Sequence, residues 1–219
     1  MKKADVMIKN AYIITMDHDR NIISNGCIVI DKDKITAVGG GELASCYEAS
    51  RVVDAKGKFV FPGMISTHSH LFQTMLKGLG RDKLLFDWLD SSVRTALHRF
   101  DGEMCYYAAL TGCMEAIQSG TTTLLDYMYC HTSPGLSDYV TQAMEDIGIR
   151  GIYGRGFTNT ANFPPEFKVA HHDTEQDMFD DVRRLYKKYE GHSRMSVALA
   201  PGIIWDNTDD GYREMRKMA

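Results

Sequence analysis

The pattern of apolar and polar positions changes character near residue 58. Residues 5–54 contain short apolar runs rich in β-branched side chains, which Asn, Asp and Gly separate at close intervals. Such spacing is typical of a small antiparallel sheet. From residue 58 onward, apolar strands alternate with amphipathic helices, which indicates parallel β/α architecture. The chain is therefore predicted to contain a small β domain over residues 1–57 and a β/α domain over residues 58–219.

The β/α part contains four predicted strands with amphipathic helices between them. Asp101 suits the N-cap of the first helix, and a glycine follows each of three helices where a left-handed residue ends a helix. The apolar stripes of these helices are interpreted as core packing. A final segment, DDGYREMRKMA, begins a fourth helix. The strands are KFVFPGMIST (58–67), TTTLLDYM (121–128), IRGIYGRGF (149–157) and RMSVALAP (194–201), and the glycines are Gly120, Gly148 and Gly191.

Charge and composition exclude several classes of partner. The net charge of -4 and the pI near 6.0 give no basic surface, so neither nucleic acid nor an anionic membrane is expected to bind. Five cysteines without a C-x-x-C motif argue against a disulfide framework or a zinc knuckle. No apolar run reaches the roughly 18 residues of a membrane span, and the N-terminal segment turns polar too early for a signal peptide. We expect a cytoplasmic protein that binds a small molecule.

Two histidines, His68 and His70, stand one residue apart at the end of the first β/α strand. Alternate residues of a strand share a face, so both imidazoles point to one side while Ser69 points to the other. Two neutral imidazoles on one face suit zinc, iron or another borderline transition metal. An isolated H-x-H pair is more often accidental than functional. This pair, however, follows an apolar run and a Pro-Gly, where a barrel strand would end and where (β/α)8 barrels gather their active sites.

The segment PGMISTHSHLFQTMLKGLGRD, followed by LFDWL, resembles the first barrel strand and loop of the amidohydrolase superfamily. The resemblance is to the branch with triazine hydrolases and guanine, oxoguanine, pterin and adenosine-type deaminases. VMIKNAYIITMD, ITAVGG and VVDAKGKFVFPG are similar to its N-terminal β-sandwich, SGTTTLLDYMYCH to its second strand and SVALAP to its fourth. The resemblance covers nearly the whole chain. It implies an α/β fold: the N-terminal half of a (β/α)8 TIM-like barrel, preceded by a small β-sandwich segment.

The resemblance also implies one divalent metal, with His68 and His70 as its first two ligands. Zinc is favoured over iron, although two histidines do not decide between them. The metal would lower the pKa of a bound water, and the resulting hydroxide would attack a ring carbon and displace ammonia. The implied reaction is hydrolytic deamination of a guanine-, pterin-, cytosine- or triazine-like heterocycle by a homo-oligomer. The fourth strand contains no lysine to bridge two metals, which favours a single ion, and the cytidine-deaminase signature is absent.

Four further residues take roles from the same resemblance. Gln73 would contact the substrate ring, with the alternative that its amide caps the following helix. Trp88 would line the pocket, with the alternative that it is a buried aromatic side chain holding the loop. Tyr129 follows the second strand, where pocket residues arise, and His131 is interpreted as a supporting or surface residue rather than a ligand. His171 and His172 are interpreted as part of a polar loop.

The predicted strands supply only half of a barrel, which takes about 250 residues. The other family elements are a histidine on each of strands five and six, an aspartate on strand eight and a catalytic glutamate near strand five. The remaining histidines of this sequence fit none of these positions. We therefore expect an N-terminal half of an aminohydrolase, with its acid/base residues beyond residue 219. Two hypotheses stay open: deamination by a full-length parent, and a catalytically silent chain that needs a partner or its missing half. A dimer of two half-barrels is disfavoured because it would only repeat the H-x-H pair.

Overall fold

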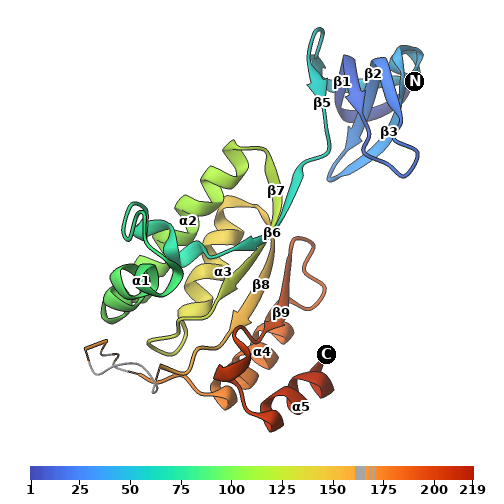
Figure 1. The fold of residues 1–219 in the computed structure, drawn as a ribbon. Coiled ribbons are helices and arrows are strands. Elements are labelled where there is room, and N and C mark those ends of the chain that lie inside the picture. Colours follow the sequence, from blue (N-terminus) through green and yellow to red (C-terminus); the bar gives the residue numbers. More distant parts are fainter. Residues whose placement is uncertain (161–165, 168, 170) are drawn as a thin grey trace. The chain divides into compact units, whose positions relative to one another are not determined.

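The protein folds into two compact units, Met1–Gly63 and Met64–Ala219. The computed structural model, drawn in Figure 1, describes residues 1–160, 166–167, 169 and 171–219. Within these residues, no helix combines the length and the apolar character needed to cross a bilayer.

The first unit is built on a five-stranded sheet in the order β3-β2-β1-β4, with β5 also paired to β1. The predicted antiparallel sheet is wrong in part, because β4 and β5 both pair with β1 in parallel. Parallel neighbours need a crossover connection, and the 3-10 helix η1 lies on the connection between β3 and β4. The elements are β1 (Lys2–Ile14), β2 (Ile22–Asp31), β3 (Lys34–Gly40), η1 (Gly41–Cys46), β4 (Tyr47–Asp54) and β5 (Phe59–Val60).

The segment 58–67, predicted as one strand, is two strands in two different units. Its first part is β5, in which Phe59 pairs with Tyr12 of the first unit. Its second part opens β6 of the second unit at Met64. Pro62 and Gly63 separate them, because proline lacks the N–H that a continuous ladder requires. The boundary between the two units falls after Gly63 in the sequence.

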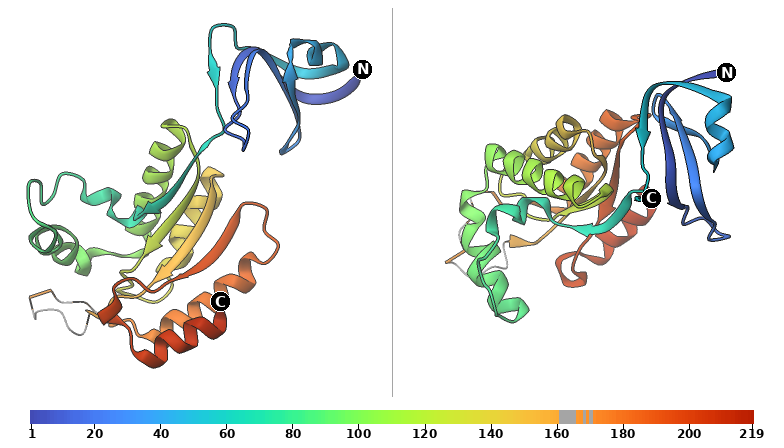
Figure 2. Two further views of the ribbon diagram at one scale, coloured as in Figure 1. Left: turned by 45° about the vertical axis from the view of Figure 1, so that its right-hand side comes forward. Right: turned by 90° about the horizontal axis from the view of Figure 1, so that it is seen from above.

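The second unit contains a parallel sheet in the order β6-β7-β8-β9 (Figure 2). The strand order never reverses, so right-handed crossovers place the connecting helices on one face of the sheet. Accordingly, α2 packs on β7, α3 on β8, and α4 on β8 and β9. The strands are β6 (Met64–Ser69), β7 (Thr121–Met128), β8 (Arg150–Gly156) and β9 (Met195–Ala200). The helices are η2 (Leu71–Leu76), α1 (Leu85–Leu89), η3 (Asp90–Arg94), η4 (Leu97–Arg99), α2 (Gly102–Gln118), α3 (Leu136–Ile147), α4 (Glu175–Tyr189), η6 (Ile204–Asp206) and α5 (Asp209–Met218).

The helix ends follow the local signals of the sequence. The Asp101 side chain accepts the Met104 amide at 2.8 Å and caps α2. Gly120, Gly148 and Gly191 all have positive φ, as predicted for the ends of α2, α3 and α4. The α4 helix begins at Glu175, where Thr174 and Asp177 form a reciprocal capping box.

The core of the second unit lies between the sheet and its helices. In β7, Leu124, Asp126 and Met128 are buried on the helix side, whereas the alternating Leu125 and Tyr127 are only half-buried. The opposite face of the sheet carries the histidine pair at the carboxyl end of β6. The fold thus places a packed apolar layer behind the strand ends that form the candidate site.

Candidate functional site

His68 and His70 lie together at the carboxyl end of β6, with ring centroids 4.9 Å apart. His70 Nδ1 is 2.8 Å from the carbonyl oxygen of Tyr127 on the neighbouring strand. A carbonyl can only accept, so Nδ1 carries the proton and the Nε2 lone pair of His70 is left for another partner. This arrangement, in which one ring nitrogen is held by the protein, is the usual one for a metal-ligating histidine.

The local environment keeps His70 in its neutral, ligating form. Burial lowers the pKa of His70, the neighbouring His68 lowers it further, and the hydrogen bond to Tyr127 opposes both. His68 is exposed and His70 is half-buried.

Two adjacent imidazoles at the end of one strand fit a divalent transition metal, to which they would supply two of about four ligands. In the described part of the chain, no carboxylate, thiol or further histidine forms a three-residue ligand group with this pair.

A cavity of about 250 Å³ opens beside His70, near the lower end of the size range of small-molecule pockets. Its walls are mostly apolar and aromatic, and Arg94, Thr158 and Asp206 add polar groups. Burial raises the pKa values of Tyr127 and Tyr129, so both phenols are neutral at physiological pH. The cavity can therefore hold a flat ring among apolar groups and offer it neutral hydrogen-bonding side chains.

Gln73 and Tyr129 both line this cavity and are joined by a hydrogen bond. The Gln73 amide Nε2 donates to the Tyr129 hydroxyl at 2.6 Å. The Tyr129 ring packs edge-on against His70, with centroids 5.5 Å apart. Gln73 lies within η2, and its side chain is directed to Tyr129 rather than to a helix N-terminus. The family resemblance gives each of these residues a role, and the structure joins their side chains by a hydrogen bond.

Trp88 lies in α1. It lines the cavity with His70, and it also packs as a half-buried side chain against the main core cluster. The lining residues that the sequence did not predict include Arg94, Tyr127 and Asp206. Tyr127 had a usable signal, since it shares one strand face with Leu125 by simple alternation. Arg94 and Asp206 lie in the short helices η3 and η6, whose placement no periodicity reveals.

His131 lies away from this cavity. It is buried, its Nε2 is 3.3 Å from the Met128 carbonyl oxygen, and it lines a different pocket with Arg155 and His171. Burial lowers its pKa well below the ordinary value, so it is neutral. The structure thus places His131 outside the cavity and away from the surface.

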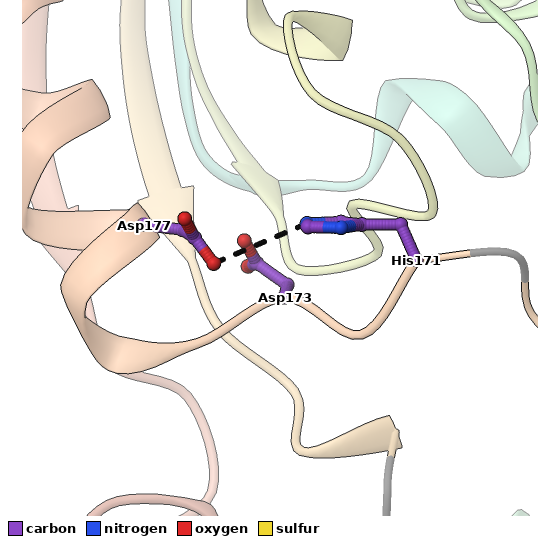
Figure 3. Close-up of side chains that lie close together, drawn as sticks. All are labelled: His171, Asp173 and Asp177. Atoms are coloured by element: carbon purple, nitrogen blue, oxygen red, sulfur yellow. Dashed lines mark ion pairs between the residues drawn. The ribbon is translucent and has the colours of Figure 1, made fainter.

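His171, Asp173 and Asp177 form the other cluster with metal-ligating chemistry (Figure 3). Asp173 already receives two hydrogen bonds of 2.8 Å from the Arg155 guanidinium. Asp177 belongs to the capping box of α4, and its carboxylate lies 4.0 Å from His171. A buried guanidinium beside these carboxylates disfavours a bound cation, so the cluster is interpreted as the junction between a polar loop and α4.

Asp126 should make the free energy of unfolding of the second unit depend on pH. Burial raises its pKa from 3.8 to about 7, opposed by the hydrogen bond from the Leu71 amide. The carboxyl group of Asp126 has a higher pKa in the folded protein than in the unfolded chain. The free energy of unfolding therefore falls as the pH rises from about 4 to 7, because the unfolded chain loses this proton first. We expect the stability of Asp126→Asn relative to the parent to increase as the pH rises over this range. The increase should be at most about 4 kcal/mol, because each pKa unit corresponds to ~1.4 kcal/mol.

Urea unfolding at pH 5, 6 and 7, followed by tryptophan fluorescence, measures this effect, since both tryptophans belong to the second unit. Asp146→Asn, at an exposed position, is the control and should leave the pH dependence unchanged. A constant difference between Asp126→Asn and the parent across this range would show that Asp126 is already ionised in the folded protein.

The chain is similar to known proteins in sequence and in fold. 5-Methylthioadenosine/S-adenosylhomocysteine deaminase of Bacillus cereus is 30% identical over 191 residues, which cover 87% of this chain and 41% of that protein. A zinc-bound adenosine deaminase of Xanthomonas campestris matches the whole chain, with a TM-score of 0.87 at 19% identity, over 47% of its own length. Zinc-complexed atrazine chlorohydrolase TrzN of Arthrobacter aurescens matches 98% of the chain, with a TM-score of 0.81 at 21% identity, over 50% of its length.

These matches confirm the predicted α/β fold with its parallel sheet. The chain spans less than half the length of the curated relative and about half the length of the solved structures. The amidohydrolase family model matches residues 59–219, which include all of the second unit. This chain belongs to the amidohydrolase family.

Proposed function

We propose that the protein containing this chain catalyses metal-dependent hydrolytic deamination of an amino-substituted heterocycle. The observation that carries the proposal is the histidine pair: His70 is fixed through Nδ1 by the Tyr127 carbonyl, and its ring borders an apolar cavity. The family membership and the deaminase among the relatives support the reaction class.

His68 and His70 would hold the metal, which we propose to be zinc, as in the zinc-bound adenosine deaminase and triazine hydrolase structures. When bound, the ion supplies a water-derived nucleophile near neutral pH. Tyr127 keeps the His70 ring in one orientation through its carbonyl group. Leu85, Phe86 and Leu89 form an apolar wall against which the ring that enters would pack. Gln73, oriented by Tyr129, also lines the cavity.

We further propose that the substrate is an adenosine-type purine nucleoside. The name of the curated relative points to 5-methylthioadenosine and S-adenosylhomocysteine as first compounds. The cavity supports this choice because Trp88, Val93 and Ile203 offer apolar contacts, whereas Arg94 and Asp206 can hydrogen-bond polar groups of a nucleoside. Guanine, pterins, cytosine and triazines are the competing substrates.

The test is an ammonia-release assay on the purified, zinc-loaded protein with these compounds. Release from 5-methylthioadenosine faster than from guanine, cytosine or atrazine supports the purine nucleoside. Faster release from another ring moves the proposal to that substrate. Zinc bound at one ion per chain without ammonia from any of these compounds would contradict deamination and support the catalytically silent chain.

Tyr129→Phe should weaken substrate binding by about 5- to 10-fold, because loss of one hydrogen bond costs on the order of 1 kcal/mol. The substitution removes the hydroxyl that orients Gln73 but keeps the ring that packs on His70. The expected signature is a raised KM with a smaller change in kcat. Steady-state kinetics on the best substrate measure it, with Tyr186→Phe on the exposed face of α4 as control. An unchanged KM would show that the orientation of Gln73 does not matter for binding.

We also propose a cytoplasmic location and a homo-oligomeric state. All five cysteines are free, which suits a reducing compartment. Light scattering after size-exclusion chromatography tests the oligomeric state, and a monomer at micromolar concentration would contradict it.

A further inference from the structure

Three consecutive residues after His68 are each tied to β7 by a bond that involves a side chain. The Ser69 hydroxyl donates to the Leu125 carbonyl at 2.8 Å, and His70 Nδ1 donates to the Tyr127 carbonyl at 2.8 Å. Between them in β7, Asp126 Oδ1 accepts the Leu71 backbone N–H at 2.7 Å. The strand pairing of β6 with β7 is irregular between Ser66 and Ser69, so side chains take over where the backbone ladder loses its register.

The Leu71 amide needs this acceptor. His70 leaves regular strand geometry, with φ -135° and ψ 82°, and Leu71 opens the 3-10 helix η2. The first amides of a helix have no partner inside it. Leu71 is buried, with 4% of its surface exposed, so water cannot replace the carboxylate as acceptor. The end of the histidine-bearing strand therefore depends on one side chain from β7.

Asp126 occupies an otherwise apolar position. It is fully buried on the helix side of β7, between Leu124 and Met128. Its second oxygen, Oδ2, has no hydrogen-bond partner within the described residues. Burying a carboxyl group without a cation is unfavourable, and the Leu71 bond is the interaction that opposes the effect of burial on its pKa. A leucine or a methionine would pack better at this position, so the carboxyl group is present for its hydrogen bond.

We propose that Asp126 is a positioning residue for the proposed metal ligands, holding the backbone immediately after His70 through the Leu71 amide. With that backbone fixed, the His70 ring keeps Nδ1 on the Tyr127 carbonyl and Nε2 toward the site. The proposal rests on the proposed metal role of His68 and His70. Asp126 itself does not line the cavity, whereas the next residue, Tyr127, does. It therefore acts through His70 and not on the substrate.

The test compares three substitutions in the intact protein. Asp126→Asn keeps an oxygen acceptor for the Leu71 amide, whereas Asp126→Leu removes it at similar volume. Asp181→Asn is the control: Asp181 is also largely buried and bonded, to Ser137 and Arg155, but it lies on α4 away from β6. If Asp126→Leu does not fold by circular dichroism, Asp126→Ser replaces it, since serine is too short to reach Leu71.

Two readouts are taken without metal, so that they do not depend on the proposed function. Nitrogen-15 histidine NMR gives the tautomer of His70, assigned with His70→Asn, and hydrogen exchange gives the protection of the Leu71 amide. We expect the parent, Asp126→Asn and Asp181→Asn to hold the Nδ1–H tautomer. Asp126→Leu should show a mixture of tautomers and at least about 10-fold faster exchange at Leu71, which the lost acceptor would leave open.

The third readout is zinc affinity, which should fall about 10- to 100-fold in Asp126→Leu, as when a supporting partner of a ligand is removed. An unchanged His70 tautomer and an unchanged Leu71 exchange rate in Asp126→Leu would overturn the proposal. Equal defects in Asp126→Asn and Asp126→Leu would also overturn it, because the asparagine retains the acceptor. If no variant and no parent binds zinc while the tautomer and exchange results hold, the metal role of the histidines fails and the positioning of His70 stands.

Discussion

His70→Asn is expected to lower the zinc affinity of the protein by more than about 100-fold, beyond the 10- to 100-fold effect of losing a supporting partner. The asparagine amide nitrogen sits near the position of Nδ1 and can still donate to the Tyr127 carbonyl, 2.8 Å from Nδ1 in the parent. It has no atom at the position of Nε2. The substitution thus removes the ligand atom and keeps the hydrogen bond that anchors this position.

Zinc content after dialysis against a weak chelator, measured by mass spectrometry, checks the result. The expected loss of ammonia release should follow the loss of zinc. His98→Asn is the matched control, because His98 is an exposed histidine of the same unit outside the cavity. Full zinc occupancy in His70→Asn would show that His70 is not a ligand, whatever the activity of the variant.

Arg155→Met is expected to destabilise the second unit by about 3–5 kcal/mol, the usual effect of removing one partner from a buried ion pair. The Arg155 guanidinium binds Asp173 through two bonds of 2.8 Å and Asp181 through one of 2.9 Å. Its side chain is 3% exposed and that of Asp173 is equally buried. Methionine fills the space of the aliphatic stem but leaves Asp173 without the guanidinium, whereas Asp181 keeps its pair with Arg184.

Urea unfolding at pH 7, followed by tryptophan fluorescence, measures the loss. Arg183→Met is the control: Arg183 pairs with Asp180 and Glu214 at the surface, where such pairs contribute about 0–1 kcal/mol. The deficit of Arg155→Met should shrink on acidification toward pH 5. A buried carboxylate without a cation has a raised pKa in the folded protein. Its charged form destabilises the fold at pH 7, and protonation at lower pH removes this destabilisation. Equal losses in Arg155→Met and Arg183→Met would mean that the buried network adds no stability.

Local sequence signals determined the elements of the second unit. Asp101 capped its helix and Gly120, Gly148 and Gly191 ended theirs, since caps and left-handed residues act within one turn of the chain. The alternation of β7 placed Leu125 and Tyr127 on one face for the same reason. In the first unit, local signals failed for β4, whose parallel pairing with β1 depends on residues far apart in sequence.

In the candidate site too, some features depend on local sequence and others on tertiary contacts. The sequence by itself determined that His68 and His70 share a strand face, because the period of a strand is two residues. Only the tertiary structure decided which nitrogen of His70 is held, because the acceptor belongs to Tyr127, on a neighbouring strand. It alone also decided that Asp126 supports Leu71 rather than facing the cavity. The two-residue period of a strand follows from its local backbone geometry, whereas its hydrogen-bond partners depend on the register that the packed sheet imposes.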